Sequence, residues 1–281
     1  MGIKSFDLPP DGLKDGAIAT SSELENVELT EDQDYHNPEN PGGMHIIMRP
    51  QVALYMMKVE IPTDVINEIN THIDETIIPN NKDFSDQLVG QIKRDTKSAQ
   101  LKFPHKDDEV GEMVAGLLQK LGQTYIKNVV EKEGILSSKN TVVTTESMWT
   151  VHSYEGDYNP LHDHGTATPI GLSCILYLKV PDQIKALPNP AEEFYGLNSS
   201  SGSTDGFTYF VWGNHGMRDI NMLRPATEEY VKPEEGVLLM FPSWLRHSVN
   251  PFFGEGERRT FSANMNVILD GKVPYVTTES N

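Results

Sequence analysis

Hydrophobic positions follow a helical period in one part of this chain and an extended period in the next. Between residues 62 and 130, apolar residues recur at helical spacing, as on one buried face. A first helix is predicted to begin at Pro62-Thr63-Asp64. A second is predicted after Asp107-Asp108-Glu109, whose carboxylates suit the positive end of a helix dipole. We expect both helices to pack against the outer face of a sheet.

Short β-rich runs dominate from about residue 140 to 270. These runs are Thr141 to Val151, Leu172 to Val180, Phe207 to Trp212, Val237 to Phe241 and Arg259 to Ile268. The stretch from His45 to Glu60 also suits strands. Helices followed by strands predict an α+β fold built on an antiparallel sandwich or barrel.

Two segments show no sustained pattern. Residues 1–45 carry ten Asp or Glu against two Lys, and they are predicted to form an acidic, irregular extension. Residues 46–281 are predicted to form a single domain. Within it, the Pro- and Ser-rich insertion at about 181–205 is typical of a disordered loop or a functional lid.

Composition limits the partners that we expect. A formal net charge of -18 repels phosphate backbones, so nucleic acid is not expected to bind. No apolar run is long enough to cross a membrane, and the first residues lack the apolar core of a signal peptide. The single cysteine, Cys174, excludes an internal disulfide, and a reducing, cytoplasmic setting is expected. The oligomeric state stays open, with a homodimer built on the acidic extension as one candidate.

Three of the nine histidines stand in a context that indicates metal binding. His162 and His164 are two residues apart, so in an extended segment both imidazoles project to the same side. His247 follows an apolar strand whose end would bring it to the mouth of a barrel. From the residues alone, zinc or another divalent metal would suit such a set.

Four landmarks in the same half of the chain occur in a familiar order. They are Trp149 to Tyr158 followed by His162-Asp163-His164, Ser173 to Leu178, Gly236 to His247, and Arg258 to Asn264. From about Trp149 to Asn264 the sequence therefore resembles the 2-oxoglutarate- and iron(II)-dependent oxygenase family of prolyl-hydroxylase-like proteins. The resemblance implies a double-stranded β-helix, a jelly-roll or cupin-like barrel, with flanking N-terminal helices.

The third metal ligand is the point at which the chain departs from the wider superfamily. Most of those enzymes use His-x-Asp, whereas His164 stands at the carboxylate position here. We predict a face of three histidines, His162, His164 and His247. Asp163 would replace His164 if the strand were locally kinked.

The resemblance also implies how a cosubstrate is held. Arg258 would anchor the far carboxylate of 2-oxoglutarate, with Thr260 adding a hydroxyl from the same strand face. Arg259 is the competitor, but strand alternation places it on the opposite face. Further residues expected to face the cosubstrate are Tyr154, Asn159, Tyr177 and Asn264.

The predicted function is that of an iron(II)- and 2-oxoglutarate-dependent dioxygenase. As the resemblance implies, dioxygen and 2-oxoglutarate would be consumed, succinate and carbon dioxide released, and a small molecule or protein side chain hydroxylated. Two alternatives remain. One is a non-catalytic metal-binding β-barrel module, and the other is a cupin-type metalloenzyme that does not use 2-oxoglutarate. The latter has no need of Arg258.

Overall fold

A computed structural model describes residues 46–51, 54–85, 99–133, 141–190, 202–214 and 226–268, with the backbone alone for 46–51 and 130–133. The predicted acidic extension, residues 1–45, lies outside the described residues, as does 191–201 of the predicted insertion. The division into an extension and one domain therefore stays a prediction.

Two antiparallel sheets form the centre of the molecule. The larger has seven strands, in spatial order β1 (Ile46–Gln51), β2 (Leu54–Glu60), β9 (Val237–Pro242), β6 (Gly171–Lys179), β11 (Arg258–Ile268), β4 (Val142–Ser153) and β3 (Ala99–Lys102). The smaller has four, in the order β5 (Asn159–His162), β10 (Arg246–Val249), β7 (Thr208–Val211) and β8 (Glu228–Val231). This is a double-stranded β-helix, and the predicted fold class is confirmed.

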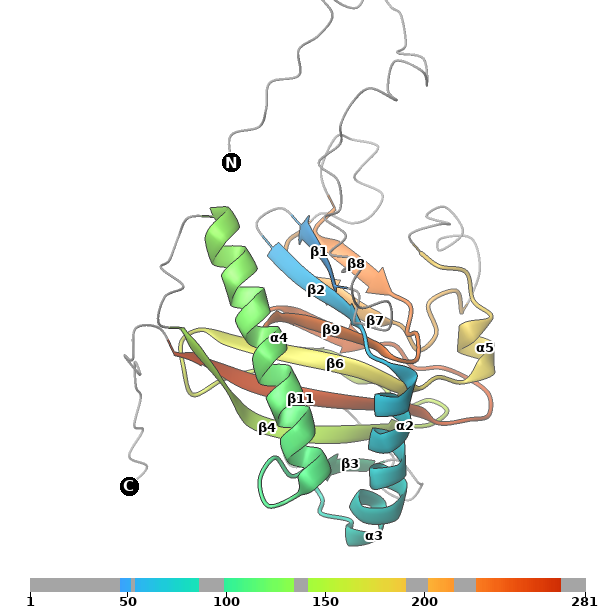
Figure 1. The fold of residues 1–281 in the computed structure, drawn as a ribbon. Helices are drawn as coiled ribbons and strands as arrows, with labels where there is room; N and C mark the ends of the chain where they lie inside the picture. Colours follow the sequence, from blue (N-terminus) through green and yellow to red (C-terminus); the bar gives the residue numbers. More distant parts are fainter. Residues whose placement is uncertain are drawn as a thin grey trace, which may run out of the picture.

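Helices cover one face of the larger sheet. They are α2 (Thr63–His72), the π-helical turn η1 (Ile73–Ile77), α3 (Ile78–Asn80) and α4 (Glu109–Glu133), with the short α5 (Asp182–Lys185) elsewhere. Figure 1 shows α4 crossing the strands obliquely, with α2 near one end of them. The smaller sheet packs against the opposite face, so the larger sheet is covered on both sides.

Strand alternation divides the interior into two cores. On β6, Leu172, Cys174 and Leu176 join the core under the helices, whereas Ile175 and Tyr177 join the core between the sheets. The same period of two runs along β2, β9 and β11. The near-continuous apolar run of β6 therefore reflects a strand buried on both faces.

Helix α4 begins where the sequence indicates. The Asp108 carboxylate accepts a hydrogen bond of 2.7 Å from the Gly111 backbone N–H, which satisfies one of the free amides of the first turn. Gly111 is required there, because a Cβ would lie 2.1 Å from the carbonyl oxygen of Pro104. Farther along, the hydroxyl of Tyr125 donates to the carbonyl of Tyr55 on β2 at 2.6 Å and fixes the helix over the sheet.

Some predicted elements need correction. The segment 62–130 was expected to be helical, but it contains β3, which pairs with β4 at the edge of the larger sheet. The four-residue strands β8 and β10 were also not predicted. Strands this short carry too few residues to show a period, and their pairing partners decide their conformation.

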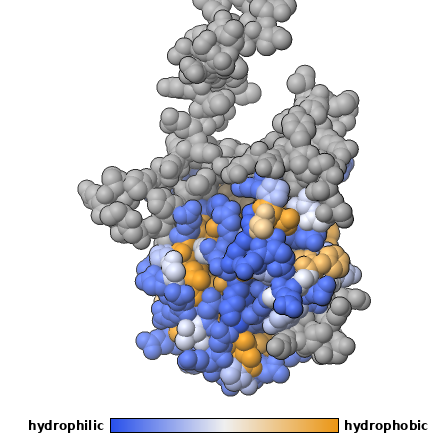
Figure 2. Space-filling model, turned by 90° about the vertical axis from the view of Figure 1, so that its right-hand side faces the viewer, coloured by the Kyte–Doolittle hydropathy of each residue, from blue (hydrophilic) through white to orange (hydrophobic). Residues whose placement is uncertain are grey.

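Figure 2 shows one side of the molecule as mostly hydrophilic, with hydrophobic residues in small separate groups. Among the described helices, none combines the length and hydrophobicity required to cross a membrane.

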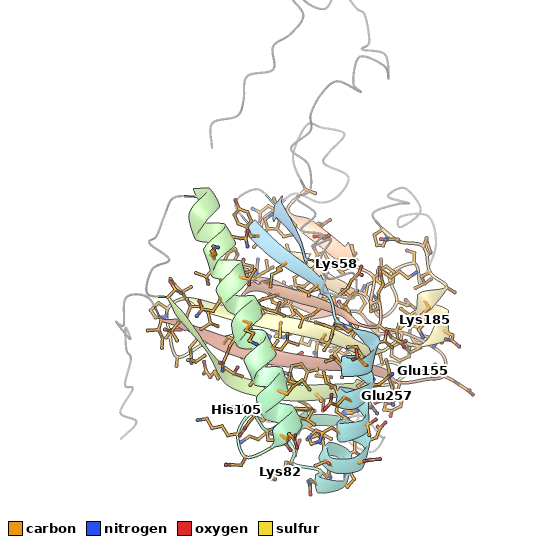
Figure 3. The ribbon with its side chains drawn as sticks, in the orientation of Figure 1. Lys58, Lys82, His105, Glu155, Lys185 and Glu257 are labelled. Carbon is orange, nitrogen blue, oxygen red and sulfur yellow. The ribbon has the colours of Figure 1, made fainter. Side chains whose placement is uncertain are left out.

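An ion network around the buried Arg259 ties α2 and η1 to the start of β11. Arg259 is 2% exposed, and its guanidinium donates to Glu257 at 2.8 Å, to Asp74 at 2.6 Å and to Asn70 at 3.1 Å. The Nδ1 of His152 lies 2.7 Å from the same Glu257 carboxylate, which sits beside α2 in Figure 3. Burial alone would raise the pKa of Glu257, but hydrogen bonds from His152 and Arg259 lower it to about 2.

This network predicts a loss of stability in acid. Because the pKa of Glu257 in the folded protein lies below its ordinary value of 4.5, its stabilisation is complete above about pH 4.5 and is lost as the pH falls towards 2. Glu257→Gln should lower the free energy of unfolding at pH 7 by about 1–3 kcal/mol and should flatten its fall between pH 5 and 3. Urea unfolding measures both quantities. The exposed Glu255 supplies a matched control, since Glu255→Gln should leave the pH profile of the wild type unchanged.

Candidate active site

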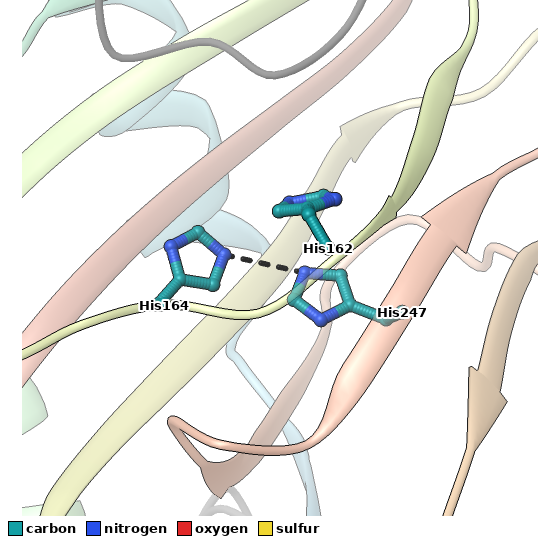
Figure 4. A group of neighbouring side chains, drawn as sticks. All are labelled: His162, His164 and His247. Atoms are coloured by element: carbon teal, nitrogen blue, oxygen red, sulfur yellow. Dashed lines mark hydrogen bonds between the residues drawn. The ribbon is translucent and has the colours of Figure 1, made fainter.

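Three histidines meet between the two sheets. His162 on β5 and His247 on β10 are direct partners in the pairing of these strands. His164 follows β5 by two residues, and its backbone N–H donates to the carbonyl of Ser243 at 2.9 Å, which holds the segment against the β9–β10 turn. One ring nitrogen from each histidine lies within 4.8 Å of those of the other two. Figure 4 shows the three rings turned towards a common point.

The backbone fixes the tautomers of two of these rings. The Nδ1 of His162 lies 2.8 Å from the carbonyl oxygen of Pro160, and that of His247 lies 3.0 Å from the carbonyl oxygen of Leu245. A carbonyl oxygen only accepts, so each Nδ1 carries the proton and each Nε2 keeps a lone pair. The Nε2 atoms of His164 and His247 are 3.3 Å apart. Lone pairs directed at one point, with the opposite nitrogens held by carbonyls, are typical of metal ligands.

The surroundings keep the imidazoles of His164 and His247 neutral. Burial, followed by repulsion from His162, lowers the pKa of His164 to about 4. For His247, burial and repulsion from His162 and His164 lower the pKa to about 3, although its backbone hydrogen bond opposes the shift. At neutral pH both rings are therefore uncharged, as a metal ligand must be. The donor set fits a divalent transition metal of the type that imidazole prefers.

Asp163, the predicted alternative ligand, is placed elsewhere. Its side chain is exposed, and it is absent from the group of close ligand atoms that the described residues form at this point. Regular alternation along the extended segment places it opposite His162 and His164. The arrangement favours His164 as the third ligand.

A pocket extends from the three histidines along the inner face of the larger sheet. Its lining includes Gln100 of β3, Trp149, Val151 and Ser153 of β4, Ser173 and Ile175 of β6, and Arg258, Thr260 and Ser262 of β11. Among the described residues that line it, none carries a carboxylate. The charge of this wall is therefore positive, and it comes from Arg258.

Arg258 is a buried cation that has no anionic partner among the described residues. It is 2% exposed, and its Nε donates to the carbonyl of Gly206 at 2.9 Å and its Nη2 to the hydroxyl of Thr208 at 3.3 Å. Its guanidinium carbon lies 5.5 Å from the ring centre of Tyr177. Within the described ranges, no carboxylate forms an ion pair with it, and burial lowers its pKa. An unneutralised buried charge is costly, so this arrangement favours an anionic ligand.

The neighbouring arginine has the opposite environment. Arg259 lies on the helix-facing side of β11, where Glu257 and Asp74 neutralise it. The two arginines are thus separated by the alternation expected for a strand, and the pocket contains Arg258.

The other predicted cosubstrate residues divide into two groups. Thr260 and Asn159 line the pocket. Tyr177 lies beneath Arg258, fully buried, with its hydroxyl 2.8 Å from that of Thr208, and it does not line the pocket.

Tyr154 and Asn264 do not line the pocket either, and their contact with a cosubstrate stays a prediction. Tyr154 follows the end of β4, and the phenol lies in the field of Glu257 and Arg259. The Asn264 side chain accepts a hydrogen bond of 2.8 Å from the Ser173 hydroxyl, farther along β11.

Gln100 was missed by sequence reasoning. It is 2% exposed, lines the pocket, and comes from the unpredicted strand β3. Nothing in the polar sequence around it indicates a buried position, because the strand has only four residues. Only the pairing of β3 with β4 reveals it.

Comparisons with known proteins bear on the same region. Residues 147–264 match the family described as "Putative 2OG-Fe(II) oxygenase", which confirms the resemblance predicted from the sequence. No curated protein matches the chain significantly.

Solved structures with a similar fold include a Pseudomonas putida prolyl-4-hydroxylase, 12% identical with a TM-score of 0.42 over 75% of this chain and 91% of that one. The collagen prolyl hydroxylase of Paramecium bursaria Chlorella virus-1, solved with 2-oxoglutarate, is 16% identical with a TM-score of 0.38 over 77% and 98%. HygX from Streptomyces hygroscopicus, solved with iron, is 10% identical with a TM-score of 0.43 over 75% and 81%.

The geometry predicts which side chains a metal requires. His162→Ala, His164→Ala and His247→Ala should each weaken Fe(II) binding, measured anaerobically, by more than the roughly 10–100-fold typical of losing an outer-shell partner. Asp163→Asn should bind Fe(II) like the wild type, since the carboxylate is exposed.

His105→Ala is the matched control, because His105 lies outside the group of three and precedes α4 (Figure 3). The converse result, with Asp163→Asn losing the metal and His164→Ala keeping it, would show that the kinked alternative is correct.

Proposed function

We propose that this chain, whose residues 147–264 match the 2OG-Fe(II) oxygenase family, is an iron(II)- and 2-oxoglutarate-dependent dioxygenase that uses His162, His164 and His247 as iron ligands. Arg258 anchors the far carboxylate of 2-oxoglutarate in the same pocket. The reaction consumes dioxygen and 2-oxoglutarate, releases succinate and carbon dioxide, and hydroxylates a substrate.

The proposal rests on one observation. A single pocket contains three histidines that could bind a metal ion and a buried cation, Arg258, that forms no ion pair with a carboxylate among the described residues. Three neutral imidazoles leave the charge of a divalent ion intact, and Arg258 adds a further positive charge. A small dianion would neutralise most of this charge. Its two carboxylates could be bound separately, one near the metal and one by the guanidinium.

Strand geometry sets a suitable separation between these two points. Arg258 donates to Thr208 of β7, and Phe210 on the same strand pairs with His247. Two residues along an antiparallel strand span about 7 Å. The guanidinium contact and the histidines are thus separated by about the length of a short dicarboxylate.

Each group has a distinct role in this function. When bound, iron(II) supplies the redox chemistry that couples cosubstrate decarboxylation to dioxygen activation. The three histidines would hold the metal. Arg258 orients the cosubstrate, Thr260 lies on the same face of β11 and offers a hydroxyl, and the sheets exclude bulk water.

The alternatives account for fewer of these features. A cupin-type metalloenzyme that does not use 2-oxoglutarate would leave Arg258 buried without a counter-charge. A non-catalytic metal-binding module would not require a pocket that holds both a metal and an anion. We therefore place both below the oxygenase.

The substrate, on this proposal, is a small molecule or a protein side chain. We place the enzyme in the cytoplasm, since Cys174 is buried and free and an acidic chain suits that setting. A homodimer is compatible with the proposal and is not required by it.

A spectroscopic titration tests the function. Anaerobic addition of Fe(II) and 2-oxoglutarate should produce the visible charge-transfer band of the chelate, and admission of oxygen should yield succinate. Arg258→Met should weaken 2-oxoglutarate binding by about 100-fold, as expected for the loss of a buried charge-assisted pair, while Fe(II) binding is retained. Arg246→Met is the matched control, since Arg246 is the exposed neighbour of His247.

A second cosubstrate makes the test specific for the far carboxylate. The wild type should prefer 2-oxoglutarate to 2-oxobutyrate, which lacks that carboxylate, and Arg258→Met should lose most of this preference. Absence of the band in the wild type would exclude the proposed function. A band without succinate would favour the non-catalytic module.

A further inference from the structure

Gln100 lines the pocket and carries a hydrogen-bond acceptor that is unpaired among the described residues. Its Nε2 donates to the carbonyl oxygen of Phe84 at 3.1 Å, and its Oε1 is buried without a hydrogen-bond partner in the part of the chain that the structure describes. The side chain cannot be flipped to reverse these roles, because Oε1 would then face a carbonyl oxygen, which also only accepts. The Phe84 carbonyl therefore fixes an acceptor on the remaining side of the amide.

Gln100 and Arg258 lie on strands of the larger sheet that are separated by β4. Gln100 is paired with Val151 of β4, which is in turn paired with Thr260 of β11. Neighbouring strands are about 4.8 Å apart, so Gln100 and Thr260 are separated by about 10 Å across the sheet. Gln100 and Arg258 thus line different parts of the pocket.

The part of the pocket that Gln100 lines nevertheless connects directly with the histidines. The rings of Phe84 and Trp149 have centres 5.8 Å apart, and those of Trp149 and His164 have centres 5.6 Å apart. Trp149 and Gln100 both line the pocket. A group bound beside Trp149 would therefore lie next to the metal ligands while facing Gln100.

The cosubstrate cannot satisfy this acceptor. 2-Oxoglutarate is a dianion at neutral pH and has no hydrogen-bond donor, so Gln100 Oε1 would repel it. Hydroxyl groups of the pocket, such as those of Ser153 and Thr260, can rotate to donate or accept, but an amide oxygen only accepts. Orphaned buried acceptors are rare, and a ligand donor is the simplest completion of this one.

We infer that Gln100 is a specificity-determining residue that binds a neutral N–H or O–H donor of the substrate, beside Trp149. The inference rests on the proposed function. A cationic donor is disfavoured, because Arg258 and the metal already make the pocket positive. The substrate class is thus a neutral amide or hydroxyl compound, or a peptide segment presenting such a group.

A matched pair of small probes tests the inference. Benzamide and N,N-dimethylbenzamide differ in their N–H donors, and both are neutral and planar enough to pack beside Trp149. Full-length protein loaded with Zn(II) is titrated with each probe, with and without 2-oxoglutarate, and ligand-observed NMR gives the affinities. The wild type should prefer benzamide by about fivefold, as expected for one neutral hydrogen bond.

Variants of two glutamines identify the source of this preference. Gln100→Met, which has no acceptor oxygen at this position, should abolish it. Gln123→Met is the control, since Gln123 also donates to a backbone carbonyl, that of Thr141 at 3.0 Å, but lies on α4 away from the pocket.

The outcomes separate this inference from the proposed function. The iron–2-oxoglutarate band tests the function, and the probe preference tests the inference. If the band forms in both the wild type and Gln100→Met, the function stands. If the probe preference is then absent, or is the same in Gln100→Met as in the wild type, the inference is wrong. A preference abolished in Gln100→Met supports the inference even if the band never forms, since the probes are also titrated without 2-oxoglutarate. If the wild type binds neither probe, the inference is wrong. In that case a bound water is the sole partner of Gln100 Oε1.

Discussion

The position of β11 between β4 and β6 is the constraint on which the site depends. This strand pairs with β4 from Arg258 to Ile268 and with β6 over most of that length. Side chains alternate along it, so a shift of one residue would exchange its two faces. The apolar residues Phe261, Ala263 and Met265 lie in the core under the helices and fix the register. Their burial therefore determines that Arg258, and not Arg259, faces the pocket.

The two adjacent arginines show how the same side chain serves structure on one face and ligand binding on the other. Arg259 is neutralised by Glu257 and Asp74, and it joins η1 to the sheet. Arg258 has hydrogen bonds to neutral oxygens alone among the described residues, so its charge is stabilised less completely. Such a difference suits a binding site. Burying the charge of Arg258 costs desolvation free energy that its neutral partners do not fully offset, and a bound anion can offset the remainder.

Much of this arrangement could be predicted from the sequence, where the signal was periodic. The long strands, both helices and the separation of Arg258 from Arg259 follow from alternation and apolar spacing. The proximity of His162 to His164 follows from their spacing of two, but their meeting with His247 depends on the pairing of β5 with β10. Gln100 could not be predicted, since its four-residue strand exists through pairing with β4. Alternation does not determine the direction of Tyr154, because the strand ends at Ser153 and Tyr154 does not line the pocket.

The three-histidine face that we propose for the metal would have a consequence for selectivity that a carboxylate ligand would not have. An imidazole in place of a carboxylate leaves the metal site one unit more positive, and Arg258 adds to the same field. The burial that keeps His164 and His247 neutral also excludes water that would screen this charge. A dianionic cosubstrate would then neutralise most of the positive charge of the metal and Arg258 without attracting a second cation. Under these charges, the acceptor on Gln100 can select a neutral donor, and the field of the pocket rejects a positively charged one.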